Sequence, residues 1–143
     1  MRGPTKSIVV DSIARVLIPC IFTFGFYVLF FGHESPGGGF QGGAIIASGI
    51  ILSRMTLPLK DSFSIMSDKK AFSVATIGVF IYLSVGVITF FQTGNYFDYS
   101  MLTAILEKPF NHYWGIMAVE IGVTLCVVGT MVLIFDVLAE DYT

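Results

Sequence analysis

The stretch Gly32-His33-Glu34-Ser35-Pro36-Gly37-Gly38-Gly39-Phe40-Gln41-Gly42-Gly43 places five glycines within seven residues, directly after a long apolar segment. Each glycine costs a helix about 1 kcal/mol relative to alanine, so helix stability does not explain the cluster. Two uses do explain it: backbone angles that other residues avoid, and the close approach of another backbone where no side chain fits. The sequence therefore predicts an abrupt bend, begun by Pro36, that a neighbouring backbone approaches closely.

Four apolar segments lie on either side of this bend, at about residues 8–31, 40–57, 71–91 and 113–138. Apolar residues make up 55% of the 143 positions and charged residues only 13%, whereas soluble domains carry about 25% charged residues. Mean hydropathy is +0.81. A bilayer core about 30 Å thick needs roughly 20 apolar residues per helix, and no segment has the polar face of a soluble bundle helix. We expect an all-α integral membrane protein, a single membrane domain with four transmembrane helices.

The basic residues predict how this domain is oriented. In a chain with four spans, the N-terminus, the second loop and the C-terminus share one side of the membrane. Because positive charge near helix ends is retained in the cytoplasm, we expect both termini to be cytoplasmic and the glycine-rich loop to lie outside. The expected cytoplasmic side carries Arg2, Lys6, Arg15, Arg54, Lys60, Lys69 and Lys70, and the opposite side carries Lys108.

Several classes of binding site are excluded. Gly37, Gly39 and Gly42 satisfy the spacing G-x-G-x-x-G, but that pattern indicates a dinucleotide only between a strand and a helix. A formal charge of -2, with 8 Lys and Arg that form no continuous stripe, argues against nucleic acid. His33 and Glu34 are two adjacent ionisable groups and make no metal site. We predict no cofactor, no metal ion and no catalytic residue.

Glu120 is the acidic residue that lies deepest in the last apolar segment, about 10 Å along the helix from Tyr113. A carboxylate at such depth is costly unless it is neutralised, paired or hydrated. We therefore expect Glu120 to lie on an ion or proton path, to contact another subunit, or to reach the outer headgroups. The opposite face of the helix carries small residues that predict close packing against one other helix: Gly115, Ala118, Gly122 and Gly129.

Two further residues are candidates for the same ion path or subunit interface. Asp136 lies near the cytoplasmic end of the fourth segment, where Arg54 or Arg15 is within reach, and we interpret it first as half of a helix-end ion pair. His33 lies in the glycine-rich loop, where a histidine titrates near neutral pH. Hydrogen bonding that stabilises the turn is the preferred interpretation for His33. Asp11, four residues before Arg15, predicts a second ion pair.

The run GHESPGGGFQGGAIIASGIIL resembles the signature of the B-subunit (MnhB/MrpB) family of Mrp-type multisubunit Na+/H+ antiporters. That family shares the pattern G-H-x-x-P-G-G-G-F-x-G-G, and the chain length and acidic C-terminal tail are also similar. A related motif occurs in the equivalent subunits of membrane-bound hydrogenases and sulfur-reducing complexes. Every fixed position of the pattern is filled here, by Gly32, His33, Pro36, Gly37, Gly38, Gly39, Phe40, Gly42 and Gly43.

The resemblance implies a small, non-enzymatic membrane subunit in the cytoplasmic membrane of a prokaryote. Its partners would be other membrane subunits, lipid, and the Na+ and H+ that the whole complex exchanges. Antiporter-like subunits of this class carry buried lysines in their proton relays, whereas we expect every lysine here to lie in a loop or a terminus. Two alternatives remain: the same subunit in a hydrogenase complex, and a stand-alone multidrug exporter. The exporter needs an acid in its first span, and residues 16–31 contain none.

Overall fold

The structure is a computed structural model that describes residues 7–32, 37–58, 61–62, 65–93 and 110–140. Within these ranges the chain forms four long helices: α1 (Ile8–Phe30), α2 (Gly39–Thr56), α4 (Asp68–Thr93) and α5 (Phe110–Glu140). No strand occurs in the part of the chain that is described. The prediction of an all-α protein is therefore confirmed. Three of the helices, α1, α4 and α5, are long and apolar enough to cross a membrane.

The four helices cover the four apolar segments, but α4 begins earlier than expected. It starts at Asp68, so Lys69 and Lys70 lie in its first turn with exposed side chains. The expectation that every lysine lies outside the helices is wrong for these two. The extra turn has a physical reason, because the acidic side chain of Asp68 suits the positive amino end of a helix. The N–H of Ala71 closes the turn by donating to the carbonyl oxygen of Ser67 at 2.8 Å.

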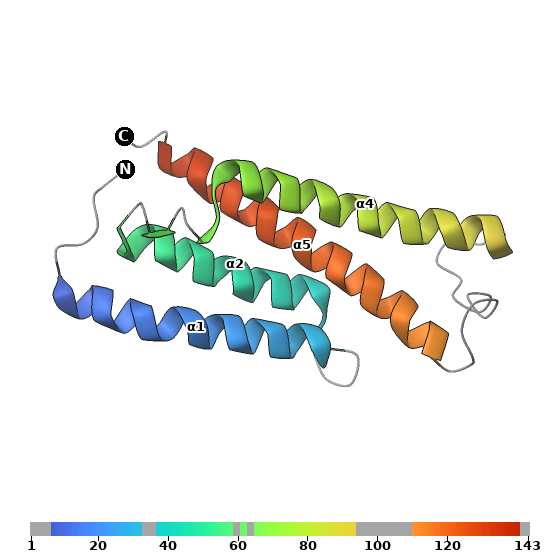
Figure 1. Ribbon diagram of the computed structural model, residues 1–143, viewed down its shortest axis with the longest axis horizontal. Coiled ribbons are helices and arrows are strands. Elements are labelled where there is room, and N and C mark those ends of the chain that lie inside the picture. Colours follow the sequence, from blue (N-terminus) through green and yellow to red (C-terminus); the bar gives the residue numbers. More distant parts are fainter. Residues whose placement is uncertain (1–6, 33–36, 59–60, 63–64, 94–109, 141–143) are drawn as a thin grey trace.

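The helices lie side by side in the order α1, α2, α5, α4 (Figure 1). Helix α2 packs between α1 and α5, and α4 packs on the other side of α5. Consecutive helices run in opposite directions. One end of the molecule, which we call the Arg54 end, therefore holds the start of α1, the end of α2, the start of α4 and the end of α5. The opposite end, where α2 and α5 begin, is called the Glu120 end.

Helices α4 and α5 approach each other through small residues. A Cβ atom built on Gly129 would lie 2.5 Å from the carbonyl oxygen of Ala71 and 2.6 Å from the nitrogen of Ala75. A Cβ on Gly122 would lie 3.1 Å from the carbonyl oxygen of Gly78, and a Cβ on Gly78 would clash with the backbone of Cys126. Such contacts let helix backbones pack closely in lipid. The predicted small-residue face of α5 is thus confirmed at Gly122 and Gly129, and α4 is the helix that it packs against.

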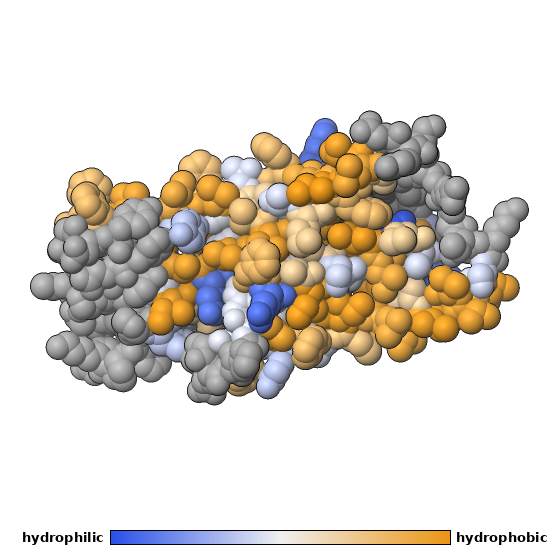
Figure 2. All heavy atoms as spheres, turned by 180° about the vertical axis from the view of Figure 1, so that it is seen from behind, coloured by the Kyte–Doolittle hydropathy of each residue, from blue (hydrophilic) through white to orange (hydrophobic). Residues whose placement is uncertain are grey.

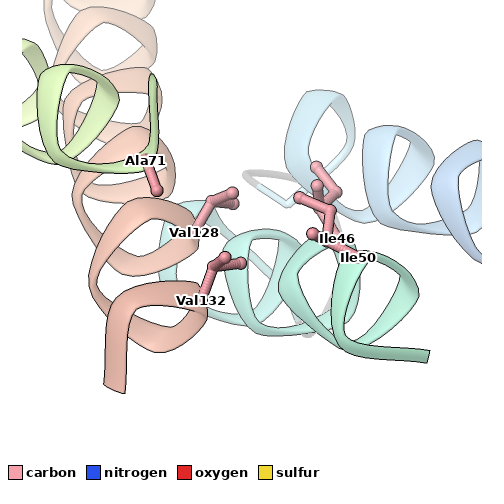
Figure 3. Close-up of a cluster of buried hydrophobic side chains, with 5 residues drawn as sticks. All are labelled: Ile46, Ile50, Ala71, Val128 and Val132. Carbon is pink, nitrogen blue, oxygen red and sulfur yellow. The ribbon is translucent and has the colours of Figure 1, made fainter. Parts of the chain in front are cut away.

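A small apolar core joins three of the helices (Figure 3). Its buried members are Ile46 and Ile50 of α2, Ala71 of α4, and Val128 and Val132 of α5. Within both α2 and α5 the two core residues lie four positions apart, which places them on one face of a helix. The core therefore holds α2 against α5 near the start of α4.

The face of the molecule seen in Figure 2 is largely apolar, as its orange atoms show. Ile8 and Phe91 each expose 82% of their surface, and Phe24, Tyr27 and Phe30 on α1 are about half exposed. A large side chain gains about 1.5–3 kcal/mol on leaving water. So many exposed apolar side chains are expected where a protein faces lipid. The surface therefore supports the finding that three helices are apolar enough to span a membrane.

Candidate functional site

The glycine-rich motif forms the turn that leads into α2. Gly38, the residue before the helix, has φ +127°, a value that favours glycine because other residues are strained there. A Cβ on Gly32 would clash with the backbone of Gly38, and a Cβ on Gly37 would lie 3.1 Å from the Cα of Gly32. The two sides of the turn therefore touch through backbone atoms, as the sequence predicts. His33 and Pro36 lie outside the described residues.

The first glycines of α2 pack directly on α5. A Cβ on Gly39 would clash with the carbonyl oxygen of Glu120, and one on Gly43 would lie 3.0 Å from the carbonyl oxygen of Thr124. The buried hydroxyl of Thr124 lies 2.8 Å from the carbonyl oxygens of both Gly39 and Glu120, and these two acceptors share its one proton. Gly39 and Gly43 are four residues apart and share one face of α2. That face is the surface that α5 approaches.

An adjacent face of α2, which carries Gly42, packs on α1. A Cβ on Gly42 would lie 3.1 Å from the carbonyl oxygen of Gly25 and 3.1 Å from the Cβ of Leu29. Gly25 is itself tight, since a Cβ there would lie 2.6 Å from a side-chain carbon of Ile46. Phe40, the aromatic residue of the motif, is 65% exposed. The motif thus holds α2 between two helices while presenting one aromatic ring outward.

Glu120 lies on the α2 side of α5, whereas the glycines of the small-residue face lie on the α4 side. Its side chain is half-buried, and its Oε1 atom would be 3.4 Å from a Cβ built on Gly38. The carboxylate therefore lies beside the amino end of α2, which carries a partial positive charge of about half an elementary charge. The expectations for Glu120 from the sequence did not include this helix end. The glycines of the motif mark where α2 begins, but the position of that helix end beside Glu120 depends on the packing of α2 against α5.

A second polar cluster lies at the Arg54 end of the molecule. The Nη2 atom of Arg54 is 3.2 Å from Oδ2 of Asp136 and 3.8 Å from Oδ1 of Asp68. Arg54 Nη2 also donates to the carbonyl oxygen of Met66. The side chains of Arg54 and Asp136 are 1% and 7% exposed, whereas that of Asp68 is 53% exposed. The expected ion pair between Arg54 and Asp136 is present, and Asp68 is an additional member that the sequence did not indicate.

Arg15 belongs to a different and exposed cluster. Its Nε atom is 3.1 Å from Oδ2 of Asp11, and its Nη2 atom is 3.6 Å from Oδ2 of Asp61. The predicted pair of Arg15 with Asp11 is therefore confirmed. Exposed pairs of this kind contribute about 0–1 kcal/mol. The Arg15 cluster is thus the exposed counterpart of the buried Arg54 cluster.

The buried cluster connects three helices and the segment between α2 and α4. Ser53 and Ser62, both buried, have their hydroxyl oxygens 3.1 Å apart, and Arg54 Nη1 lies 3.5 Å from the Ser62 oxygen. Removing one member of a buried charge pair costs about 3–5 kcal/mol, because the remaining charge is left uncompensated. The cluster therefore fixes the ends of α2 and α5 and the start of α4 relative to one another.

The two polar sites lie at opposite ends of α2 and have different chemical character. The Glu120 end offers a carboxylate, a hydroxyl and backbone carbonyls, and the Arg54 end offers two carboxylates on one guanidinium group. Among the residues that the structure describes, no group of three or more His, Cys, Asp and Glu side chains is arranged to hold a metal ion.

Comparison with known proteins gives one family. The family described as "Domain related to MnhB subunit of Na+/H+ antiporter" matches residues 9–133. A Staphylococcus epidermidis protein named "Putative antiporter subunit mnhB2" is 32% identical over 136 residues, which cover 89% of this chain and 90% of that protein. Proteins of the same name from Staphylococcus haemolyticus and Staphylococcus aureus strain Newman are 29% and 30% identical, respectively.

These similarities extend over nearly the whole chain, including the turn before α2, α2 itself and most of α5. In the S. haemolyticus protein they cover 90% of this chain and 92% of the relative, and in the S. aureus protein 89% and 90%. The similarities agree with an all-helical structure in which three helices are apolar enough to span a membrane. The chain therefore belongs to the family of proteins related to the MnhB subunit of Na+/H+ antiporters.

Proposed function

We propose that this chain is a small multi-pass membrane subunit of a multisubunit Na+/H+ antiporter. The observation that carries the proposal is the match of residues 9–133 to the MnhB-related family, together with relatives named as antiporter subunits. The packing of the glycine motif gives a physical reason for this sequence pattern: it positions α2 between α1 and α5, with Glu120 beside the amino end of α2.

The subunit is required for assembly and for exchange, and it does not transport ions alone. The apolar core supports this part of the proposal. Between the Glu120 end and the Arg54 end, α2 and α5 contact each other through Ile46, Ile50, Val128 and Val132. Apolar side chains offer no hydrogen bonds to a proton or a cation on its way between the two ends. An ion that crosses the membrane therefore uses surfaces formed with other subunits.

All four helices span the cytoplasmic membrane of a prokaryote in this proposal, with both termini in the cytoplasm. Helix α2 has 18 residues, about 27 Å at 1.5 Å per residue, and it spans because α1 and α5 cover it. The Arg54 end is the cytoplasmic end, since Arg15, Arg54, Lys69 and Lys70 all lie there. Cysteines introduced at exposed Ser7 and Phe31 test the orientation: a membrane-impermeant maleimide should label only the Phe31 position from outside intact cells.

The test of the function is deletion and copurification. Removing this chain from the complex should abolish Na+/H+ exchange in everted membrane vesicles and reduce recovery of the other subunits on one tagged partner. Reconstitution of the chain by itself in vesicles should give no proton-coupled Na+ flux, and a flux above that of empty vesicles would refute the proposal. Recovery of iron-sulfur subunits with the tagged chain would instead assign it to a membrane-bound hydrogenase or related complex. Recovery as a small oligomer that exports cationic drugs would assign it to the exporter class.

Glu120 serves the assembled complex, on its ion path or at an interface with another subunit. The substitution Glu120→Gln keeps the size of the side chain and removes its charge. Lower exchange with normal recovery of the complex would place Glu120 on the ion path, and loss of recovery would place it at the interface. Exchange and recovery at the level of the unmodified complex would refute both roles. Thr124→Val is the matched control, because it alters a neighbouring polar contact without removing a charge.

A further inference from the structure

Two carboxylates at the Arg54 end share one guanidinium group. Oδ2 of Asp136 and Oδ1 of Asp68 both lie on the Nη2 atom of Arg54, at 3.2 Å and 3.8 Å. With both acids ionised, the three side chains carry a net charge of one negative unit. Arg54 stays protonated at any physiological pH, so only the two carboxyl groups can change the charge of the cluster.

The second carboxylate oxygen of Asp136 is the most poorly compensated atom of the cluster. The Asp136 side chain is 7% exposed, and its Oδ1 atom is buried and accepts no hydrogen bond from the residues that the structure describes. A buried oxygen with negative charge and no donor is costly. A proton removes this cost, because a carboxyl group that carries one can donate a hydrogen bond to a neighbouring carboxylate.

Asp68 provides both that neighbour and the connection to water. Its carboxyl group lies against the same Nη2 atom of Arg54 as that of Asp136, and its side chain is 53% exposed. The other charged groups near the cluster do not balance it. Lys69 and Lys70 are exposed in the first turn of α4, and Arg15 already pairs with Asp11 and Asp61.

We propose that Asp136 and Asp68 form a proton-binding site, in which the two carboxyl groups share one proton while Arg54 compensates the remaining negative charge. The proton comes from the water that reaches Asp68, and it returns to that water when the site ionises. All three side chains of the site belong to this chain, but the use of the site in Na+/H+ exchange rests on the proposed function.

The charge balance predicts the behaviour of two single substitutions. In Asp68→Asn, Asp136 and Arg54 form a balanced pair, so Asp136 stays ionised and binds no proton near neutral pH. In Asp136→Asn, Arg54 balances the exposed Asp68 in the same way. Either change should therefore abolish the shared proton. Asp61→Asn is the matched control, because Asp61 is about as exposed as Asp68 but pairs with the exposed Arg15 and not with the buried Arg54.

The experiment is infrared difference spectroscopy of the purified complex during a pH titration, followed by exchange assays on the same variants. The unmodified complex and Asp61→Asn should show a carboxyl C=O stretching band that disappears as pH rises. Asp68→Asn and Asp136→Asn should lack this band. A band that persists unchanged in Asp68→Asn would overturn the proposal, and because Asp68 is exposed, this variant decides the question even if Asp136→Asn fails to assemble. A band that responds to Na+ at fixed pH and not to pH would replace the proton site with a sodium site.

The two readouts separate this site from the function of the complex. Loss of the band together with a changed pH profile of exchange, in both variants and not in Asp61→Asn, supports the site and its role in exchange. Loss of the band in a complex that never exchanges Na+ for H+ supports the site and rejects the proposed function. Persistence of the band in an active antiporter rejects the site alone.

Discussion

The substitution Gly39→Ala tests the closest contact between α2 and α5. The new Cβ atom would collide with the carbonyl oxygen of Glu120. The carbonyl carbon and the Cα atom of Glu120 are each only 2.9 Å from the position of that Cβ. Backbone atoms cannot rotate away as a flexible side chain can, so the helices must separate. Overpacking of this kind costs about 1–3 kcal/mol, and separation also weakens the hydrogen bond from Thr124 to Gly39, worth about 0.6 kcal/mol in a membrane.

We therefore expect Gly39→Ala to lower the free energy of unfolding by about 1–3 kcal/mol, after the gain in helix propensity of about 1 kcal/mol is deducted. The measurement is unfolding of the purified chain in mixed micelles of a mild detergent and dodecyl sulfate, followed by far-ultraviolet circular dichroism. Gly43→Ala is the matched control. Its Cβ would lie 3.0 Å from the carbonyl oxygen of Thr124, a smaller conflict that the gain in helix propensity of about 1 kcal/mol offsets. Equal stability of Gly39→Ala and the unmodified chain would refute the assigned contact.

Three further substitutions test other contacts by the same measurement. Thr124→Val keeps the shape of the side chain and removes the donor to Gly39, and it should cost about 0.5–1.5 kcal/mol; no loss would show that this hydrogen bond does not hold α2 to α5. Arg54→Met leaves Asp136 as an uncompensated buried charge and should cost about 3–5 kcal/mol, and adding Asp136→Asn should restore part of the loss. Gly129→Val should separate α5 from α4 and lower the free energy of unfolding by at least as much as Gly39→Ala does. Unchanged stability would argue against the contact between α4 and α5.

The sequence predicts those features that depend on neighbours in the chain. Runs of apolar residues predict the helices, and the seven-residue spacing of Gly122 and Gly129 predicts the face that α4 covers. The same holds for the pair of Asp11 and Arg15, which are four residues apart on one helix. The bend before α2 follows from the chemistry of glycine, and Gly38 confirms it with a positive φ.

Features that depend on tertiary packing were predictable only in part. No local signal places the amino end of α2 beside Glu120, because that contact requires α2 to lie between α1 and α5. Arg54 and Asp136 are 82 residues apart, and the sequence offered Arg15 as an equal partner for Asp136. Asp68 was missed as a member of the Arg54 cluster because the start of α4 was expected three residues later.

The position of α2 between α1 and α5 has a consequence for how the chain enters the membrane during synthesis. α2 carries Gln41, Ser48 and Arg54 besides its glycines. The helices that are apolar enough to span a membrane by themselves are α1, α4 and α5. When α2 leaves the ribosome, α1 is available to cover one face, but α5 and its Asp136 have not yet been made. We therefore expect α1 and α2 to insert as a hairpin, and α2 to reach its final depth only after α5 arrives to neutralise Arg54.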